Sequence, residues 1–137
     1  MTAAPTRWIG SLDFLVVEDN AFTSIVVQQT LQSLGAEHVS GARTGREALD
    51  LIEGRESPPD VILIDLRMPE MGGVELIGRL GDRGYGGHVI VTSGVDAETL
   101  TSVEALARES GMAILGCLSK PLEAAALQEL LSSIRDP

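Results

Sequence analysis

The sequence is poor in cysteine and in aromatic residues, and both shortages limit what the protein can be. Cys117 is the single cysteine among 137 residues, so the chain cannot form an internal disulfide, and a reduced, cytoplasmic protein is expected. The aromatic residues are one tryptophan, one tyrosine and two phenylalanines. A flavin carrier is therefore not expected, because such a site needs flanking aromatic rings and phosphate-binding loops rich in Ser and Thr.

Basic residues and long apolar runs are scarce as well. Ten Lys and Arg residues stand against twenty Asp and Glu residues, which gives a formal net charge of −10. A surface of this charge argues against direct binding to nucleic acid or to an anionic membrane. No apolar run approaches the length of a membrane span, and Arg7 precedes only a short segment that Asp13 interrupts. We therefore expect neither a membrane segment nor a signal peptide.

Five apolar segments alternate along the chain with five segments of helical periodicity. The central apolar segment, residues 61–64, is an unbroken Val-Ile-Leu-Ile run, which favours a parallel strand buried on both faces. This alternation predicts an α/β protein with an open parallel sheet covered by helices on both faces. The length fits one domain, which we place at residues 12–135. Residues 1–11 are predicted to be an N-terminal arm, with Trp8 and Ile9 available to dock on the domain or on a partner. The predicted strands are residues 12–17, 37–41, 61–64, 89–91 and 113–118.

Three polar residues are predicted to begin helices. Asn20 is the expected N-cap of the first helix, Thr44 forms a capping box with Glu47 at the second, and Asp96 is the expected cap of the fourth. Gly35 is a natural stop for the first of these helices. The apolar positions expected along that helix include Phe22, Ile25, Val26, Leu31 and Leu34.

Four of the predicted strands are followed by polar side chains where the strand ends. These residues are Glu18 and Asp19, then Asp65, Ser93 and Lys120. A single one would most simply be a helix cap or a solvated loop group, but the carboxyl ends of parallel strands share one edge of the sheet, so all five are expected to meet. Three carboxylates with one ammonium and one hydroxyl group indicate a site for a hard cation such as Mg²⁺, beside a place for an anion.

The charges of this predicted cluster favour a bound cation. Two carboxylates ~5 Å apart repel each other by roughly 3 kcal/mol at an effective dielectric constant of 20, and three carboxylates make three such pairs. Lys120 offsets only part of this repulsion. The site without a divalent ion is therefore expected to be strained or partly protonated.

With these residues in place, the chain resembles the response-regulator receiver domains (CheY-like) of two-component signalling. The resemblance covers nearly the whole chain and is carried by four stretches: LDFLVVEDN, DVILIDLRMPEMGG, VIVTSG and LSKP. It implies a flavodoxin-like (βα)5 fold with the strand order 2-1-3-4-5. It also implies a regulatory phosphoacceptor domain rather than an enzyme, which takes a phosphoryl group from a sensor histidine kinase or a phosphotransfer protein. The further partners implied are an output domain or a downstream protein, and a homodimer that forms on phosphorylation is allowed.

The resemblance also assigns roles to individual residues. It implies that Asp65 accepts the phosphoryl group, and that Mg²⁺ or Mn²⁺ is held by Asp19, Asp65 and the backbone carbonyl of Arg67, with Glu18 acting through water. Lys120 would contact a phosphoryl oxygen. The residues of the switch would be Ser93, whose hydroxyl turns toward the phosphoryl group, Gly94, which leaves room for that approach, and Cys117.

Cys117 is a departure from the family pattern. Receivers usually carry Tyr or Phe at this position, three residues before the lysine, whereas here a cysteine is expected simply to pack in the fifth strand. The aromatic part of the usual switch is then absent, and activation must be relayed by Ser93 and loop movement or by a partner surface. The segment SGVDAETLTSVEALARESGMAILGCLSKPL also resembles, more weakly, receivers fused to EAL-type cyclic-di-GMP phosphodiesterase domains.

Two alternatives to a phosphorylated receiver remain open from the sequence. The first is a receiver-like interaction module that is never phosphorylated, and it must explain why all five site residues are retained. The second is an enzyme on the same fold, such as an aspartyl-phosphate hydrolase. A hydrolase would be expected to carry a general acid two residues after Asp65, where this chain has Arg67.

Overall fold

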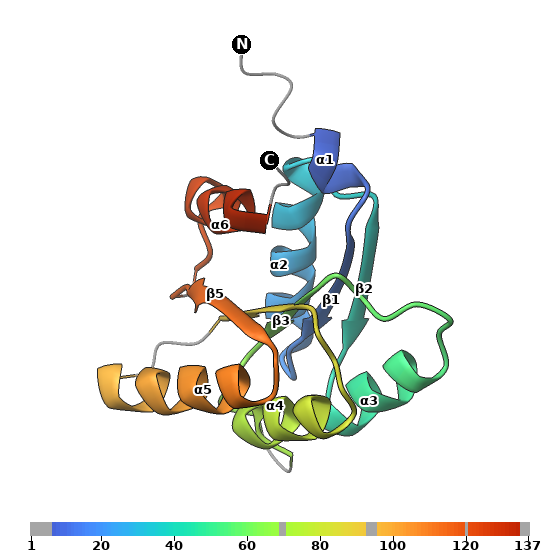
Figure 1. The fold of residues 1–137 in the computed structure, drawn as a ribbon. Helices are drawn as coiled ribbons and strands as arrows, with labels where there is room; N and C mark the ends of the chain where they lie inside the picture. Colours follow the sequence, from blue (N-terminus) through green and yellow to red (C-terminus); the bar gives the residue numbers. More distant parts are fainter. Residues whose placement is uncertain (1–6, 69–70, 93–95, 120, 135–137) are drawn as a thin grey trace.

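The fold is a single five-stranded parallel sheet with helices on both sides (Figure 1). The computed structural model describes residues 7–68, 71–92, 96–119 and 121–134. The strand order is β2-β1-β3-β4-β5, with every neighbouring pair parallel, as expected for a flavodoxin-like fold. The strands are β1 (Asp13–Val17), β2 (His38–Ala42), β3 (Val61–Ile64), β4 (His88–Val91) and β5 (Ala113–Cys117). The helices are α1 (Arg7–Gly10), α2 (Ala21–Ser33), α3 (Gly45–Glu53), α4 (Gly73–Asp82), α5 (Ala97–Glu109), α6 (Ala124–Leu131) and the 3-10 turn η2 (Ser132–Ile134).

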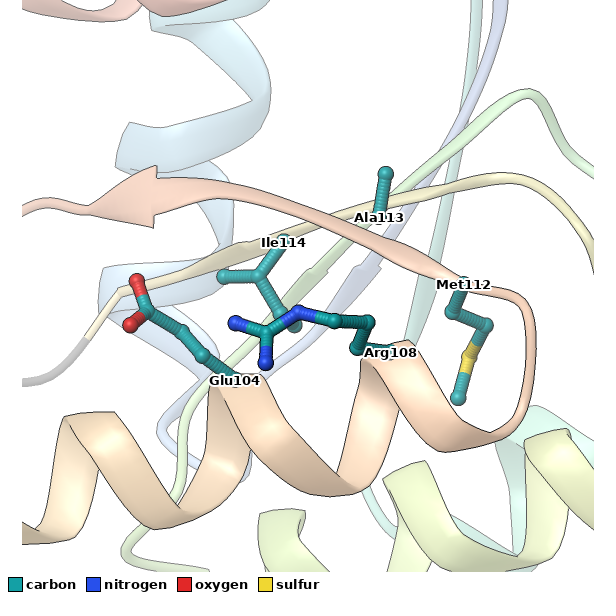
Figure 2. A pocket seen from close by; sticks show the side chains of 5 residues that line it. All are labelled: Glu104, Arg108, Met112, Ala113 and Ile114. Atoms are coloured by element: carbon teal, nitrogen blue, oxygen red, sulfur yellow. The ribbon is translucent and has the colours of Figure 1, made fainter.

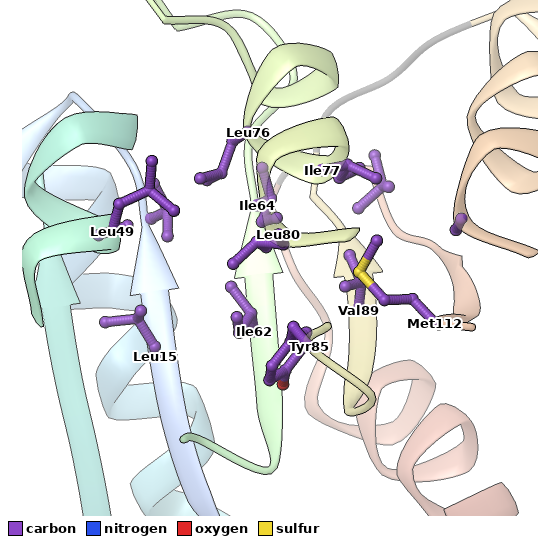
Figure 3. Packing of buried hydrophobic residues seen from close by; sticks show 14 of the residues in the cluster. Leu15, Leu49, Ile62, Ile64, Leu76, Ile77, Leu80, Tyr85, Val89 and Met112 are labelled. Atoms are coloured by element: carbon purple, nitrogen blue, oxygen red, sulfur yellow. The ribbon is translucent and has the colours of Figure 1, made fainter. Parts of the chain in front are cut away.

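The sheet separates two hydrophobic cores, because successive side chains of a strand point to opposite faces. Leu15 and Val17 of β1 pack with α3, α4 and α5, in the core that Figure 3 shows. Phe14 and Val16 of the same strand pack on the other face with α2 and α6. All four residues of β3 are fully buried, as the unbroken apolar run predicted. The predicted α/β sheet covered on both faces is therefore confirmed.

The three predicted N-caps are confirmed. Asn20 accepts a hydrogen bond from the Thr23 N–H at 2.9 Å, Thr44 caps α3, and Asp96 caps α5 by accepting from the Thr99 N–H at 2.7 Å. Hydrogen bonds from Thr99 hold the pKa of Asp96 below its ordinary value. These caps fix where each helix starts, directly after the loops that follow the strands.

Several details differ from the sequence predictions or decide what they left open, such as where Trp8 and Ile9 dock. Strand β2 lies one residue later than expected, at His38–Ala42. Helix α1 docks Ile9 into the core beside α2, with no exposed surface on Ile9, and Trp8 packs partly buried against the same core. On α2, Phe22 and Ile25 are 75% and 53% exposed, because the helix turns Ser24, Val27 and Leu31 toward the sheet instead. Within the described ranges, no helix is long and apolar enough to cross a bilayer.

Tyr85 closes the core at the end of the sheet opposite the β1 and β3 carboxyl ends. Its hydroxyl donates a hydrogen bond to the Pro59 carbonyl at 2.7 Å, and the residue is 5% exposed. Burial, together with the negative charges of Asp60 and Asp13, raises the pKa of Tyr85 well above its ordinary value. The neutral hydroxyl is thus the form that the fold stabilises.

Tyr85→Phe is expected to show this pH dependence. At about pH 8, the variant should lose about 1 kcal/mol of unfolding free energy, because the Pro59 carbonyl loses its donor. Above about pH 10, unfolded wild-type chains release the tyrosine proton while the folded protein keeps it, so the wild type loses stability as the pH rises. The variant has no such ionisation, and the difference between the two proteins should shrink. Urea unfolding at the two pH values measures this, and a constant difference would contradict it.

Candidate functional site

Two neighbouring strands of the sheet end in carboxylates. Glu18 follows β1 and Asp65 follows β3, and the pairing of these strands places Val17 opposite Ile64. The ladder continues past the strand ends, since the Asp65 N–H donates to the Val17 carbonyl at 3.1 Å and the Glu18 N–H donates to the Ala42 carbonyl at 3.0 Å. The backbone of both acids is therefore held by the sheet itself, which makes their positions rigid.

Glu18, Asp19 and Asp65 form one cluster. Each offers a carboxylate oxygen, and these oxygens lie within 4.8 Å of one another. Glu18 and Asp65 are only 2% and 5% exposed, and Asp19 is half-buried. At this separation each pair of charges repels by about 3 kcal/mol at an effective dielectric constant of 20. Such a cluster is costly unless it is neutralised, and this makes the arrangement suited to a cation.

Backbone N–H groups orient two of the three carboxylates. The Asn20 N–H donates to Glu18 Oε2 at 3.1 Å, and the Arg67 N–H donates to Asp65 Oδ1 at 2.9 Å. An ionised carboxylate has about four acceptor positions, so one hydrogen bond leaves capacity for a metal ligand. Oxygen donors carrying three negative charges fit a small hard cation such as Mg²⁺. The residues present therefore fit the metal that the sequence predicted.

The structure describes some of the other predicted site residues and not others. Arg67 lies in the turn directly after Asp65, and its N–H donates to Asp65 Oδ1 at 2.9 Å. Ser93, Gly94 and Lys120 lie outside the described residues. The last described residue before Ser93 is Thr92, which extends β4 past its end, because its N–H donates to the Ile64 carbonyl at 3.0 Å. Cys117 ends β5, is half-buried and packs against the core formed with α3, α4 and α5.

Comparison with known proteins decides the family. Residues 14–132 match the response regulator receiver domain. The chain belongs to this family. The receiver is 27% identical over 122 residues to the chemotaxis protein CheY of Thermotoga maritima, a match that covers 88% of this chain and 94% of that protein. It superposes with a TM-score of 0.73 on the chemotaxis protein CheY4 of Vibrio cholerae, with 27% identity, covering 90% of this chain and 98% of that one.

One relative is an enzyme of which the receiver matches only a part. The protein-glutamate methylesterase/protein-glutamine glutaminase 5 of Myxococcus xanthus is 35% identical over 99 residues, which are 72% of this chain. The match spans 28% of the methylesterase. The resemblance to these relatives therefore lies in a regulatory signalling domain, and the match to the methylesterase is no evidence for its activity in this chain.

Two features near the receiver's carboxylates were not anticipated from the sequence. Arg43, after β2, donates a hydrogen bond from Nε to the Asp19 carbonyl at 3.2 Å. Phe22 and Ile25 are exposed on α2, whose thirteen residues include no charged side chain. The sequence does contain a signal for the exposed apolar residues of α2. This helix has no charged side chain although the chain has a net charge of −10, and this indicates a surface kept free of charge repulsion.

The receiver also has a hollow away from its carboxylates. This hollow lies between α5 and β5 and has a volume of about 370 Å³. Figure 2 shows Glu104 and Arg108, two of the residues that line it, side by side on the helix. Met112, Ala113 and Ile114 complete its lining. None of the site residues that the structure describes lines this hollow, and it lies apart from the carboxylate cluster.

Proposed function

We propose that this receiver takes a phosphoryl group from a histidine kinase or a phosphotransfer protein onto Asp65, in a reaction that depends on Mg²⁺ or Mn²⁺. The observation that carries the proposal is the cluster of Glu18, Asp19 and Asp65, whose oxygens lie within 4.8 Å of one another at the ends of β1 and β3. The phosphorylated form then engages an output domain or a downstream protein through a changed surface.

The residues of the cluster have different roles in the proposed reaction. An oxygen of Asp65 forms a bond to phosphorus while the phosphorus–nitrogen bond of the phosphohistidine breaks, and the electron pair of that bond goes to the imidazole nitrogen. Asp19 and Asp65, with the Arg67 carbonyl, would hold the metal directly, and Glu18 would act on it through water. A bound divalent cation supplies positive charge to the phosphoryl oxygens, which repel an anionic nucleophile in its absence.

Asp65 is prepared for this role by its surroundings. Because the Arg67 N–H binds Oδ1, the carboxylate is held in one orientation, which is favourable for an in-line attack. We assign Lys120 the contact to a phosphoryl oxygen and Ser93 the hydroxyl that responds to phosphorylation, with Gly94 leaving space beside it. Cys117 packs where an aromatic switch residue is usual, so the response is carried by Ser93 and the loops.

An exposed apolar surface beside the carboxylates supports transfer from a protein. Phe22 and Ile25 lie in the first turns of α2, directly after the loop that carries Glu18 and Asp19. A hollow of about 280 Å³ is lined there by Phe22, Thr23, Val26, Val27, Pro121 and Leu122. A helix of the phosphodonor packed on this surface would bring its phosphohistidine to the edge of the sheet where Asp65 lies.

Intact-mass measurement tests the proposed function directly. The protein is treated with acetyl phosphate or phosphoramidate, with and without MgCl₂, and weighed. The expected result is the mass of one added phosphoryl group in the presence of Mg²⁺ and none in the presence of EDTA. Equal masses before and after treatment in Mg²⁺ would favour an interaction module that is never phosphorylated.

Mg²⁺ is expected to stabilise the folded protein beyond any effect of ionic strength. Binding to the folded state alone contributes about 1.4 kcal/mol when free Mg²⁺ is ~10 times its dissociation constant. The thermal midpoint in millimolar MgCl₂ should therefore exceed the midpoint in NaCl of equal ionic strength. Identical midpoints in the two salts would contradict the metal site.

A further inference from the structure

Arg43 joins the loop that carries two of the carboxylates to a different part of the sheet. Its Nε–H donates to the backbone carbonyl of Asp19 at 3.2 Å, across 24 positions of sequence. Arg43 follows β2, whereas Asp19 follows β1, so the contact bridges the loops after two neighbouring strands. The Glu18 N–H makes a second bridge between the same loops by donating to the Ala42 carbonyl at 3.0 Å.

The base of the Arg43 side chain is itself fixed. The Arg43 N–H donates to Glu47 Oε1 at 2.8 Å, and the Glu47 N–H donates to Thr44 Oγ1 at 3.0 Å. These two hydrogen bonds tie the loop to the first turn of α3. Arg43 therefore extends toward Asp19 from a backbone that cannot shift independently of the helix.

The partner of Arg43 differs from the partners of three other arginines. Arg55, Arg79 and Arg83 each pair with a carboxylate. In the described part of the chain Arg43 has no ion pair, and its guanidinium binds a neutral carbonyl although Asp19 carries a carboxylate on the same residue. A cation that binds the backbone in this way anchors the loop while leaving the carboxylate oxygens to a metal.

We propose that Arg43 is a positioning residue for the metal site. The inference rests on the proposed function and deepens it: by holding the Asp19 carbonyl, Arg43 keeps the Asp19 carboxylate near Asp65 and thereby strengthens Mg²⁺ binding. Its positive charge opposes the metal, but Arg43 is exposed, so solvent and salt screen that repulsion. The positioning effect is therefore expected to be the larger of the two.

Calorimetric titration with MgCl₂ tests this role without any reading of phosphorylation. Arg43→Ala is expected to raise the Mg²⁺ dissociation constant by about tenfold, the low end of what the loss of a group that orients a ligand costs. Arg43→Lys keeps a donor and the charge, and should recover most of the affinity. Arg46→Ala is the matched control, because it removes the same charge from the first turn of α3. Among the residues that the structure describes, the hydrogen bond to the Asp19 carbonyl comes from Arg43 and not from Arg46.

The outcomes separate this inference from the proposed function. A purely structural role for Arg43 would lower the thermal midpoint without changing the Mg²⁺ dissociation constant. Equal dissociation constants for Arg43→Ala, Arg46→Ala and the wild type would overturn the positioning role while leaving the metal site intact. A wild-type protein that binds no Mg²⁺ would overturn both, and the intact-mass measurement would then fail as well.

Discussion

Asp65→Asn is expected to abolish phosphoryl uptake and, at the same time, to raise the thermal midpoint of the metal-free protein. The first effect follows from the loss of the nucleophile, since an amide has no carboxylate oxygen to attack phosphorus. No other described acid lies in this cluster except Glu18 and Asp19, which are assigned to the metal. Treatment with phosphoramidate and MgCl₂ should therefore leave the mass of the variant unchanged.

The gain in stability follows from electrostatics. Replacing Asp65 removes two of the three carboxylate pairs in the cluster, each worth about 3 kcal/mol of repulsion before screening by solvent and by neighbouring dipoles. The asparagine carbonyl can still accept the hydrogen bond that the Arg67 N–H gives to Asp65 Oδ1. A net gain of about 1–3 kcal/mol in EDTA is expected. The same loss of charge weakens the Mg²⁺ site, so MgCl₂ should raise the midpoint of the variant less than that of the wild type.

Asp60→Asn is the matched control for this substitution. Asp60 lies just before β3, at the opposite end of the strand from Asp65, and its Oδ2 accepts a hydrogen bond from the Asp13 N–H at 2.8 Å. Asparagine can keep that hydrogen bond, so the control should take up a phosphoryl group as the wild type does. Uptake by Asp65→Asn, or a loss of uptake in both variants, would contradict Asp65 as the acceptor.

Much of the fold could be predicted because local and tertiary requirements agree in this chain. The apolar run at residues 61–64 has only one stable place, the middle of a sheet covered on both faces. Asn20, Thr44 and Asp96 could be predicted as caps because their short polar side chains satisfy the first N–H groups of a helix. The clustering of Glu18 and Asp65 needed only the rule that parallel strands end at one edge.

What the sequence left open depends on packing between distant segments. Periodicity marks Phe22 and Ile25 as apolar positions of α2, but the face that meets the sheet is set by Val27 and Leu31, and this leaves both outside. Ile9 is buried only because α1 folds back on the body. The contact between Arg43 and Asp19 joins loops that no local pattern connects. Such contacts become visible only when the elements are assembled.

Gly73→Ala is expected to be among the most damaging substitutions outside the two cores. Gly73 is the first residue of α4, and a Cβ there would lie 2.6 Å from the Leu66 Cα and 2.9 Å from the Asp65 carbonyl oxygen. Both contacts are with backbone, which cannot rotate away as a side chain can. The helix must move away from the loop, or the loop must move away from the helix, at a cost of about 1–3 kcal/mol or more in unfolding free energy.

The same substitution should reach the carboxylate cluster. The Gly73 N–H donates to the Leu66 carbonyl at 3.3 Å, which closes the loop from Asp65 to α4. If that loop shifts, Asp65 moves relative to Glu18 and Asp19, whose positions are set by β1 and its own loop. Mg²⁺ binding and phosphoryl uptake are therefore expected to fall together with stability, although Gly73 has no side chain and contacts no ligand.

Gly72→Ala separates the steric requirement from a general effect of replacing glycine. Gly72 has an extended backbone with φ of −70° that alanine adopts freely, and a Cβ there would meet the Leu66 carbonyl oxygen at 3.6 Å, an ordinary contact. The control should cost less than about 1 kcal/mol, the difference between two weak N-caps, and should keep its response to Mg²⁺. Denaturant unfolding and MgCl₂ titration of both variants measure the contrast. If the two variants lose the same stability, the close approach of α4 to the backbone around Asp65 is not what makes Gly73 necessary.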